Sequence, residues 1–229
     1  MRPLSRKLQG FQNSFTRNLQ GGETARVISS FRYKGVASLI GLNVASFMFL
    51  NSHYMKSRSH VDGLPRADRH FIASRYNLAQ GRFWCIPLSI FNHGDSLLHL
   101  VMNSFGLSMV GPAVELAFGA VPLVAGFLFT GTIGAILEMS MGQHWCRGAS
   151  AGVTGIFGIS AWTIPNQVFS MWGVMDIRAA PLAISIFGIE CLIGLLGSES
   201  SNMAHVAHAG GILAAIPFLY YMRWFSRFR

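Results

Sequence analysis

The chain has 229 residues, of which 51% are hydrophobic and only 12% are charged, and its mean hydropathy is +0.40. A soluble domain carries roughly 25% charged residues, so this composition excludes a large soluble domain and predicts a polytopic membrane protein. The basic residues behind the net charge of +9 lie outside the apolar segments. That distribution is typical of membrane-flanking anchors and targeting signals, and it argues against nucleic-acid binding.

The first 34 residues differ in composition from the rest of the chain. They hold seven of the 18 lysines and arginines and a single acid, Glu23. An Arg-rich, Ser-containing and acid-poor segment is typical of a mitochondrial presequence. The alternative is a basic tail on the inner side of a bacterial or secretory-pathway membrane. We therefore expect a basic N-terminal segment over residues 1–34, a membrane domain over residues 35–229, and a location in the mitochondrial inner membrane.

Six apolar segments follow, each near the roughly 20 residues that a helix needs to cross a bilayer. They cover residues 35–55, 96–117, 120–141, 149–165, 179–197 and 203–222. Backbone inside a membrane must satisfy its own hydrogen bonds, so the segments predict an all-α bundle of six transmembrane helices. An even number of spans puts both termini on one side. The lack of an internal repeat argues against a secondary transporter.

The longest connection, residues 56–95, is basic up to Arg82 and amphipathic over residues 83–91. Aromatic and apolar residues alternate there with polar ones. We expect this segment to lie in the membrane interface rather than to form a free linker.

A serine and a histidine stand inside two of the apolar segments. Ser150 lies in the run Gly148-Ala149-Ser150-Ala151-Gly152, and His208 lies in Ala207-His208-Ala209-Gly210-Gly211. Polar groups are costly in a membrane unless they are partnered or functional, and Ser with His is the minimum set for nucleophilic acyl chemistry. The alternative is structural: a glycine stripe for helix packing, with Ser150 capping a helix and His208 bonded to a carbonyl.

His99 and Asn103 are four residues apart and therefore share one face of the second span. The predicted topology brings them to a common depth with Ser150 and His208, roughly one-third into the membrane at ~1.5 Å per residue. We expect their side chains to complete an oxyanion hole with the Ser150 amide. The alternative is a polar pair that bonds the neighbouring loop.

No metal site is indicated by the cysteines, because Cys85, Cys146 and Cys191 lie far apart without CxxC spacing. A metal alternative would use three histidines, His99, His205 and His208. This set lacks a carboxylate or an HExxH companion, so we expect no metal and no cofactor.

Four motifs in order resemble those of the rhomboid intramembrane serine proteases. Residues 99–103 resemble the HxxxN of the second helix, residues 111–119 the GxxxE turn, residues 148–150 the GxS motif, and residues 207–211 the AHxGG motif of the sixth helix. The resemblance covers residues 83–215. His205, three residues before His208, is similar to the form seen in mitochondrial members.

The resemblance implies that Ser150 is the nucleophile and His208 the general base, with His99, Asn103 and the Ser150 amide holding the oxyanion. It implies an intramembrane serine endopeptidase that cleaves transmembrane protein substrates near the membrane boundary.

The family works with a dyad, so the resemblance implies no third acid. Asp95, Glu138 and Glu190 are then structural or topological, and Glu115 caps and pins the turn after the second span.

A second function stays open, because the chain departs from the family pattern in three places. Ala151 stands where the family usually has glycine, Thr154 replaces a bulky residue, and Cys85 stands where many members carry arginine. These departures favour a catalytically inactive rhomboid-like pseudoprotease that binds or conducts membrane clients, for example in a mitochondrial inner-membrane protein translocase. The sequence assigns neither a substrate nor an oligomeric state.

Overall fold

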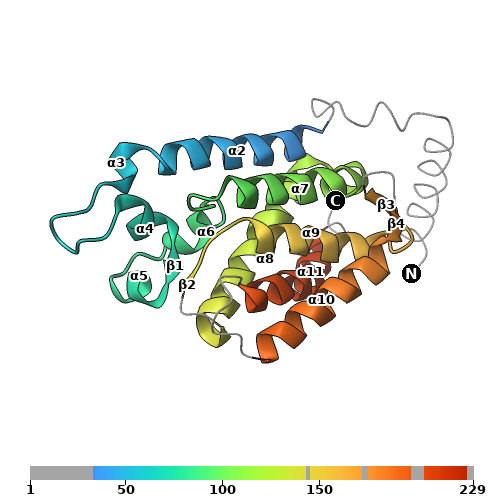
Figure 1. Cartoon of the computed structure of the whole chain (residues 1–229). Coiled ribbons are helices and arrows are strands. Elements are labelled where there is room, and N and C mark those ends of the chain that lie inside the picture. The colour runs from blue at the N-terminus through green and yellow to red at the C-terminus, as the bar shows by residue number, and fades with distance from the viewer. Residues whose placement is uncertain (1–32, 143–144, 172–174, 197–203, 226–229) are drawn as a thin grey trace.

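The computed structural model describes residues 33–142, 145–171, 175–196 and 204–225, and this part of the chain is mostly helical (Figure 1). Its long helices are α2 (Lys34–Leu50), α7 (Leu97–Phe118), α8 (Ala120–Met141), α9 (Ser150–Thr163), α10 (Ala179–Leu195) and α11 (His205–Phe225). The first residue of each helix lies within two residues of the first residue of the corresponding predicted apolar segment. Nearly all of the predicted N-terminal segment, residues 1–34, lies outside the described residues.

Among the described helices, α7 and α8 are long and apolar enough to cross a membrane, at 22 residues each. Helix α2 and residues 179–194 of α10 are apolar but shorter. The all-α class therefore agrees with the structure, whereas six transmembrane crossings remain a prediction.

Two carboxylates join helix ends that lie far apart in the sequence. Glu115 of α7 accepts hydrogen bonds from the Gly35 and Val36 amides, at 2.9 Å each, and Glu138 of α8 accepts one from the Ala207 amide at 2.8 Å. A carboxylate at a helix N-terminus accepts hydrogen bonds from N–H groups that have no partner within the helix, and its negative charge interacts favourably with the helix dipole. The expectation that Glu115 pins the turn after α7 is thus wrong for its carboxylate, which caps α2.

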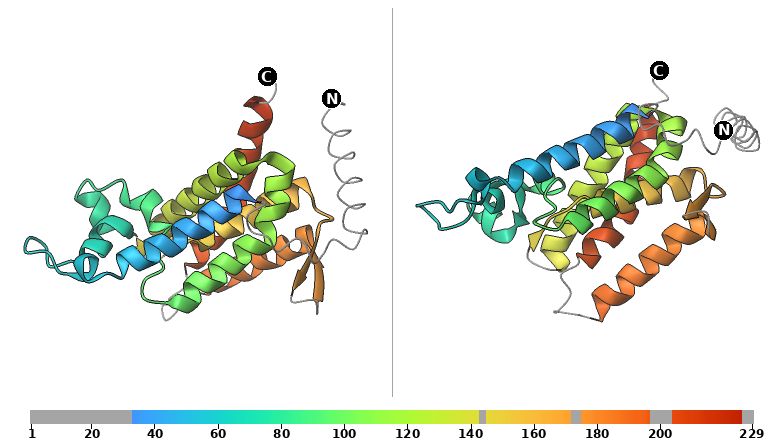
Figure 2. Two further views of the ribbon diagram at one scale, coloured as in Figure 1. Left: turned by 90° about the horizontal axis from the view of Figure 1, so that it is seen from above. Right: turned by 45° about the horizontal axis from the view of Figure 1, so that its top comes forward.

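These contacts fix the helix directions. Helix α2 begins beside the end of α7, and α11 begins beside the end of α8. The described chain consequently starts and finishes at the same end of the helix assembly, as an even number of crossings requires (Figure 2).

The centre of the assembly depends on glycine where helices α8, α9 and α11 meet. A Cβ atom added at Gly155 would overlap the Thr130 side chain, and one added at Gly158 would lie 2.8 Å from the Ile212 carbonyl oxygen. Small residues let helix backbones approach closely in a membrane protein. The glycine-stripe interpretation is therefore correct for the packing of α9, and it is independent of the role of Ser150.

The connection between α2 and α7 folds into short elements rather than a free linker. These are α3 (His53–Lys56), α4 (Arg66–Phe71), α5 (Arg75–Ala79), α6 (Cys85–Ser89) and β1 (Ala73–Ser74). Arg75 donates to the carbonyls of Met139 and Ser140, at 2.6 and 3.0 Å, and so fastens the connection to the C-terminal end of α8. Phe83 and Trp84 are exposed, which fits the predicted interfacial segment.

The described residues also contain two short antiparallel strand pairs, which the predicted all-α class did not include. Strand β1 pairs with β2 (Trp145–Cys146), just before α9, and β3 (Val168–Met171) pairs with β4 (Met175–Arg178) between α9 and α10. The first ladder holds the segment that leads into Ser150.

Candidate active site

Ser150 is the first residue of α9, and His208 lies in the first turns of α11. The Oγ atom of Ser150 lies 2.7 Å from Nε2 of His208, within hydrogen-bonding distance. The two side chains come from helices 58 residues apart in the sequence. The hydroxyl and the imidazole therefore meet, as the sequence predicts.

The contact is possible because α9 and α11 approach closely beside it. A Cβ atom added at Gly211, three residues after His208, would overlap the Ala151 carbonyl. Thr154 reinforces the approach, because its hydroxyl lies 3.0 Å from the His208 carbonyl oxygen and 3.1 Å from that of Ala151. Where the family has a bulky residue, this chain has a hydrogen bond between two helices.

Ala151 is accommodated without strain in the backbone. It lies in helical conformation within α9 and is buried. A Cβ atom added at Gly134 of α8 would lie 2.8 Å from the Ala151 methyl group. The methyl group thus occupies space that Gly134 leaves free on the facing helix.

His99 reaches the site, and Asn103 has a partner in its own helix. The His99 ring lies against Gly148, where an added Cβ atom would come within 2.5 Å of its Cε1 atom. Gly148 also has a φ angle of 113°, which favours glycine. The Asn103 amide donates to the His99 carbonyl at 2.8 Å. An oxyanion role for either residue remains a prediction.

A second histidine, His93, borders the site from the loop before α7. Its ring packs edge-on against His99, with the ring centroids 5.1 Å apart. Burial, followed by the neighbouring His99, lowers the pKa of His93 to about 4, so this imidazole is neutral at physiological pH.

Glu190 is the functional candidate that sequence reasoning missed. Its carboxylate lies 2.8 Å from Nδ1 of His208 and 2.5 Å from Nδ1 of His205. The resemblance implied only a structural or topological role for Glu190, whereas the structure places its carboxylate against the His208 ring. A signal did exist, because Glu190 is the one charged residue in α10.

The ligand atoms of Glu190, His205 and His208 all lie within 4.8 Å of one another, a spacing at which three residues can surround a metal ion. Glu190 supplies the carboxylate that the histidine-only metal alternative lacked. Hydrogen bonds already account for the short separations between these groups.

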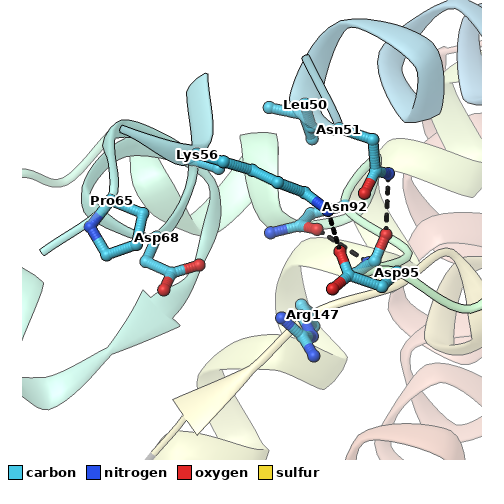
Figure 3. Close-up of a pocket in the computed structure, with 10 residues that line it drawn as sticks. Leu50, Asn51, Lys56, Pro65, Asp68, Asn92, Asp95 and Arg147 are labelled. Carbon is cyan, nitrogen blue, oxygen red and sulfur yellow. Dashed lines mark hydrogen bonds and ion pairs between the residues drawn. The ribbon is translucent and has the colours of Figure 1, made fainter. Parts of the chain in front are cut away.

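A pocket of about 340 Å³ opens beside the loop that leads to Ser150 (Figure 3). Its lining includes Asn51 at the end of α2, Lys56, Asp95 and Arg147. Lys56 and Asp95 form an ion pair at 2.9 Å, and the Asn51 amide donates to the Gly94 carbonyl at 2.9 Å. Arg147 is three residues before Ser150, so a polar cavity adjoins the approach to the serine.

Two comparisons with known proteins place this chain among its relatives. The family model described as Rhomboid domain matches residues 80–225, the part of the chain that contains α6 to α11. The chain is also similar to RHOMBOID-like protein 5 of Arabidopsis thaliana, with 26% identity over 140 residues, which are 59% of this chain and 42% of that protein. The chain thus aligns with less than half of this relative's length.

The matched domain and the apolar helices together indicate an integral membrane protein. Because the matched domain covers more than half of the chain, the protein belongs to the rhomboid family.

Proposed function

We propose that the protein is an intramembrane serine endopeptidase that cleaves transmembrane substrates near the membrane boundary. The observation that carries the proposal is the 2.7 Å contact between Ser150 Oγ and His208 Nε2. A general base must lie within hydrogen-bonding reach of the proton it removes, and this pair meets that requirement.

The chemistry follows from that contact. His208 Nε2 takes the hydroxyl proton as Ser150 Oγ attacks the scissile carbonyl, and a tetrahedral oxyanion forms. His208 then returns the proton to the leaving amine, and the acyl-enzyme remains on Ser150. Water, activated by the same imidazole, hydrolyses the ester and restores the hydroxyl group.

The substrate has to unwind before it can react. A helical peptide bond already uses its carbonyl within the helix, so attack requires an extended strand. Transmembrane segments with glycine or serine near the boundary unwind most readily, and they are the expected substrate class.

The second candidate is a rhomboid-like pseudoprotease that binds or conducts membrane clients. The observation that favours it is Ala151, which directly follows the serine where the family usually has glycine. If the Ser150 amide does not face a developing oxyanion, the fold still offers a surface for transmembrane helices.

One experiment separates the two functions. The purified protein in detergent is incubated with a fluorophosphonate probe and with a model transmembrane substrate, beside Ser150→Ala. We expect labelling and cleavage that the variant loses. Wild-type protein that is folded but neither labels nor cleaves contradicts the protease and favours the pseudoprotease.

We further propose that the protein resides in the mitochondrial inner membrane, on the composition of residues 1–34. Fractionation of cells that produce the tagged chain, with and without these residues, tests the location. We expect mitochondrial residence that depends on the segment, and residence in the plasma membrane contradicts it.

A further inference from the structure

Glu190 stands in an environment that makes a carboxylate costly. The remaining residues of α10 are uncharged and mostly apolar, and the Glu190 side chain is only 13% exposed. An ionisable group in such a segment needs partners, and here the partners are the two imidazoles of α11.

The two nitrogen atoms of the His208 ring have different partners. Nδ1 faces the Glu190 carboxylate at 2.8 Å, and Nε2 faces the Ser150 hydroxyl at 2.7 Å. A carboxylate only accepts hydrogen bonds, so the Nδ1 atom that faces it carries the proton. In a neutral imidazole the Nε2 atom is then unprotonated and free to accept the serine proton.

We propose that Glu190 is a positioning residue, which holds His208 in the tautomer and orientation that Ser150 requires. The inference rests on the proposed protease function and changes its apparatus from a dyad to an ordered series of serine, histidine and glutamate. The carboxylate also stabilises the imidazolium that forms when His208 takes the serine proton.

His205 completes the arrangement, because it occupies the second oxygen of the same carboxylate at 2.5 Å. Its ring lies near that of His208, with the centroids 6.4 Å apart. Glu190 is therefore bonded on both oxygens and cannot rotate away from His208 without losing a second partner.

The chain offers a matched control in Glu138. This carboxylate is also buried and also bonds α11, but through the backbone amide of Ala207 at 2.8 Å. A purely structural role for Glu190 predicts that the loss of either carboxylate acts only through the folded fraction. A positioning role predicts an effect on the His208 ring that Glu138 does not share.

The test uses the full chain in detergent micelles, with nitrogen-15 in its histidines. The variants are Glu190→Leu, Glu190→Gln and Glu138→Leu, and the His208 resonance is assigned by its absence in His208→Asn. Leucine suits an apolar helix and removes the acceptor, whereas glutamine keeps one acceptor oxygen. Probe labelling and substrate cleavage are expressed per folded protein.

In wild-type protein we expect His208 to carry its proton on Nδ1. In Glu190→Leu we expect the proton to move to Nε2, which then donates to Ser150. The labelling rate should fall on the order of 10²-fold or more, and substrate cleavage should fall through kcat rather than KM. Glu190→Gln should lie between Glu190→Leu and the wild type. In Glu138→Leu the tautomer should stay that of the wild type.

Two results overturn the inference. One is a wild-type His208 whose Nδ1 carries no proton. The other is a Glu190→Leu variant that keeps the wild-type tautomer and labels at a rate within about threefold of wild type. The tautomer is read by resonance and needs no turnover. If the wild type neither labels nor cleaves, the protease proposal fails while the histidine measurement still decides the role of Glu190.

Discussion

Helices α9 and α11 approach so closely that glycine is required where they meet, whereas α10 leaves large apolar side chains exposed along its length. An added Cβ atom overlaps the Ala151 carbonyl at Gly211 of α11, but it meets nothing within 4 Å at Gly188 of α10. Ile184 and Leu192 of α10 are 70% and 58% exposed. The first region is held by close backbone packing.

Helix α10 is attached differently. It contacts α9 and α11, with Ala179 and Ala183 among its buried residues, and it adds the polar contact of Glu190 to the histidines. The difference teaches that the serine–histidine contact depends on steric precision in one region and on a buried polar group in the other.

The largest expected effect comes from a side chain added to the close contact. Gly211→Val should cost about 4 kcal/mol or more and leave most of the protein unfolded, because the backbone of α9 cannot withdraw. Gly188→Val is the matched control and should stay within about 0.5 kcal/mol of wild type. Thermal unfolding in detergent measures both, and equal losses would break the comparison.

Acid should destabilise the region around the start of α9, where Ser150 lies. His93 packs on His99, and the His99 ring in turn lies against Gly148, two residues before Ser150. The pKa of folded His93 is about 4, below the unfolded value of 6.5, so the unfolded chain binds the proton first. The contribution of neutral His93 to the free energy of unfolding is complete above pH ~6.5. As the pH falls to ~4, about 3 kcal/mol of it is lost. His93→Asn should flatten the curve of stability against pH over this range. A curve that keeps the wild-type slope contradicts the assignment.

A smaller effect is expected from the hydroxyl that bonds α9 to α11. Thr154→Val keeps the shape but removes the hydrogen bond to the His208 carbonyl, at a cost of about 1 kcal/mol. Thr154→Ser keeps the hydroxyl group and should retain most of the stability. Denaturation in detergent compares the two variants, and a larger loss of stability in Thr154→Ser than in Thr154→Val would assign the effect to the methyl group instead.

The smallest effect is expected on the outer face of α10. Ile184→Ala removes an exposed side chain and should change the free energy of unfolding by less than about 0.5 kcal/mol. A loss of several times that size would show that this face is covered in the folded protein, and it would remove the contrast with the glycine contacts of α9 and α11.

Sequence reasoning located the helices well, because apolar length and the Gly119 break between α7 and α8 are local properties. It also paired Ser150 with His208, since both stand at similar depth in their segments. It missed the two short ladders, whose strands of two to four residues lack a periodic signal.

The partners of the carboxylates were decided only by the tertiary structure. The sequence shows Glu115, Glu138 and Glu190 as isolated acids in apolar segments, and nothing local names the partner of any of them. Helix directions and close approaches bring the first two to backbone amides and the third to two imidazoles. A side chain in a membrane helix finds its partner on another helix, so its role follows from packing rather than from its neighbours in the chain.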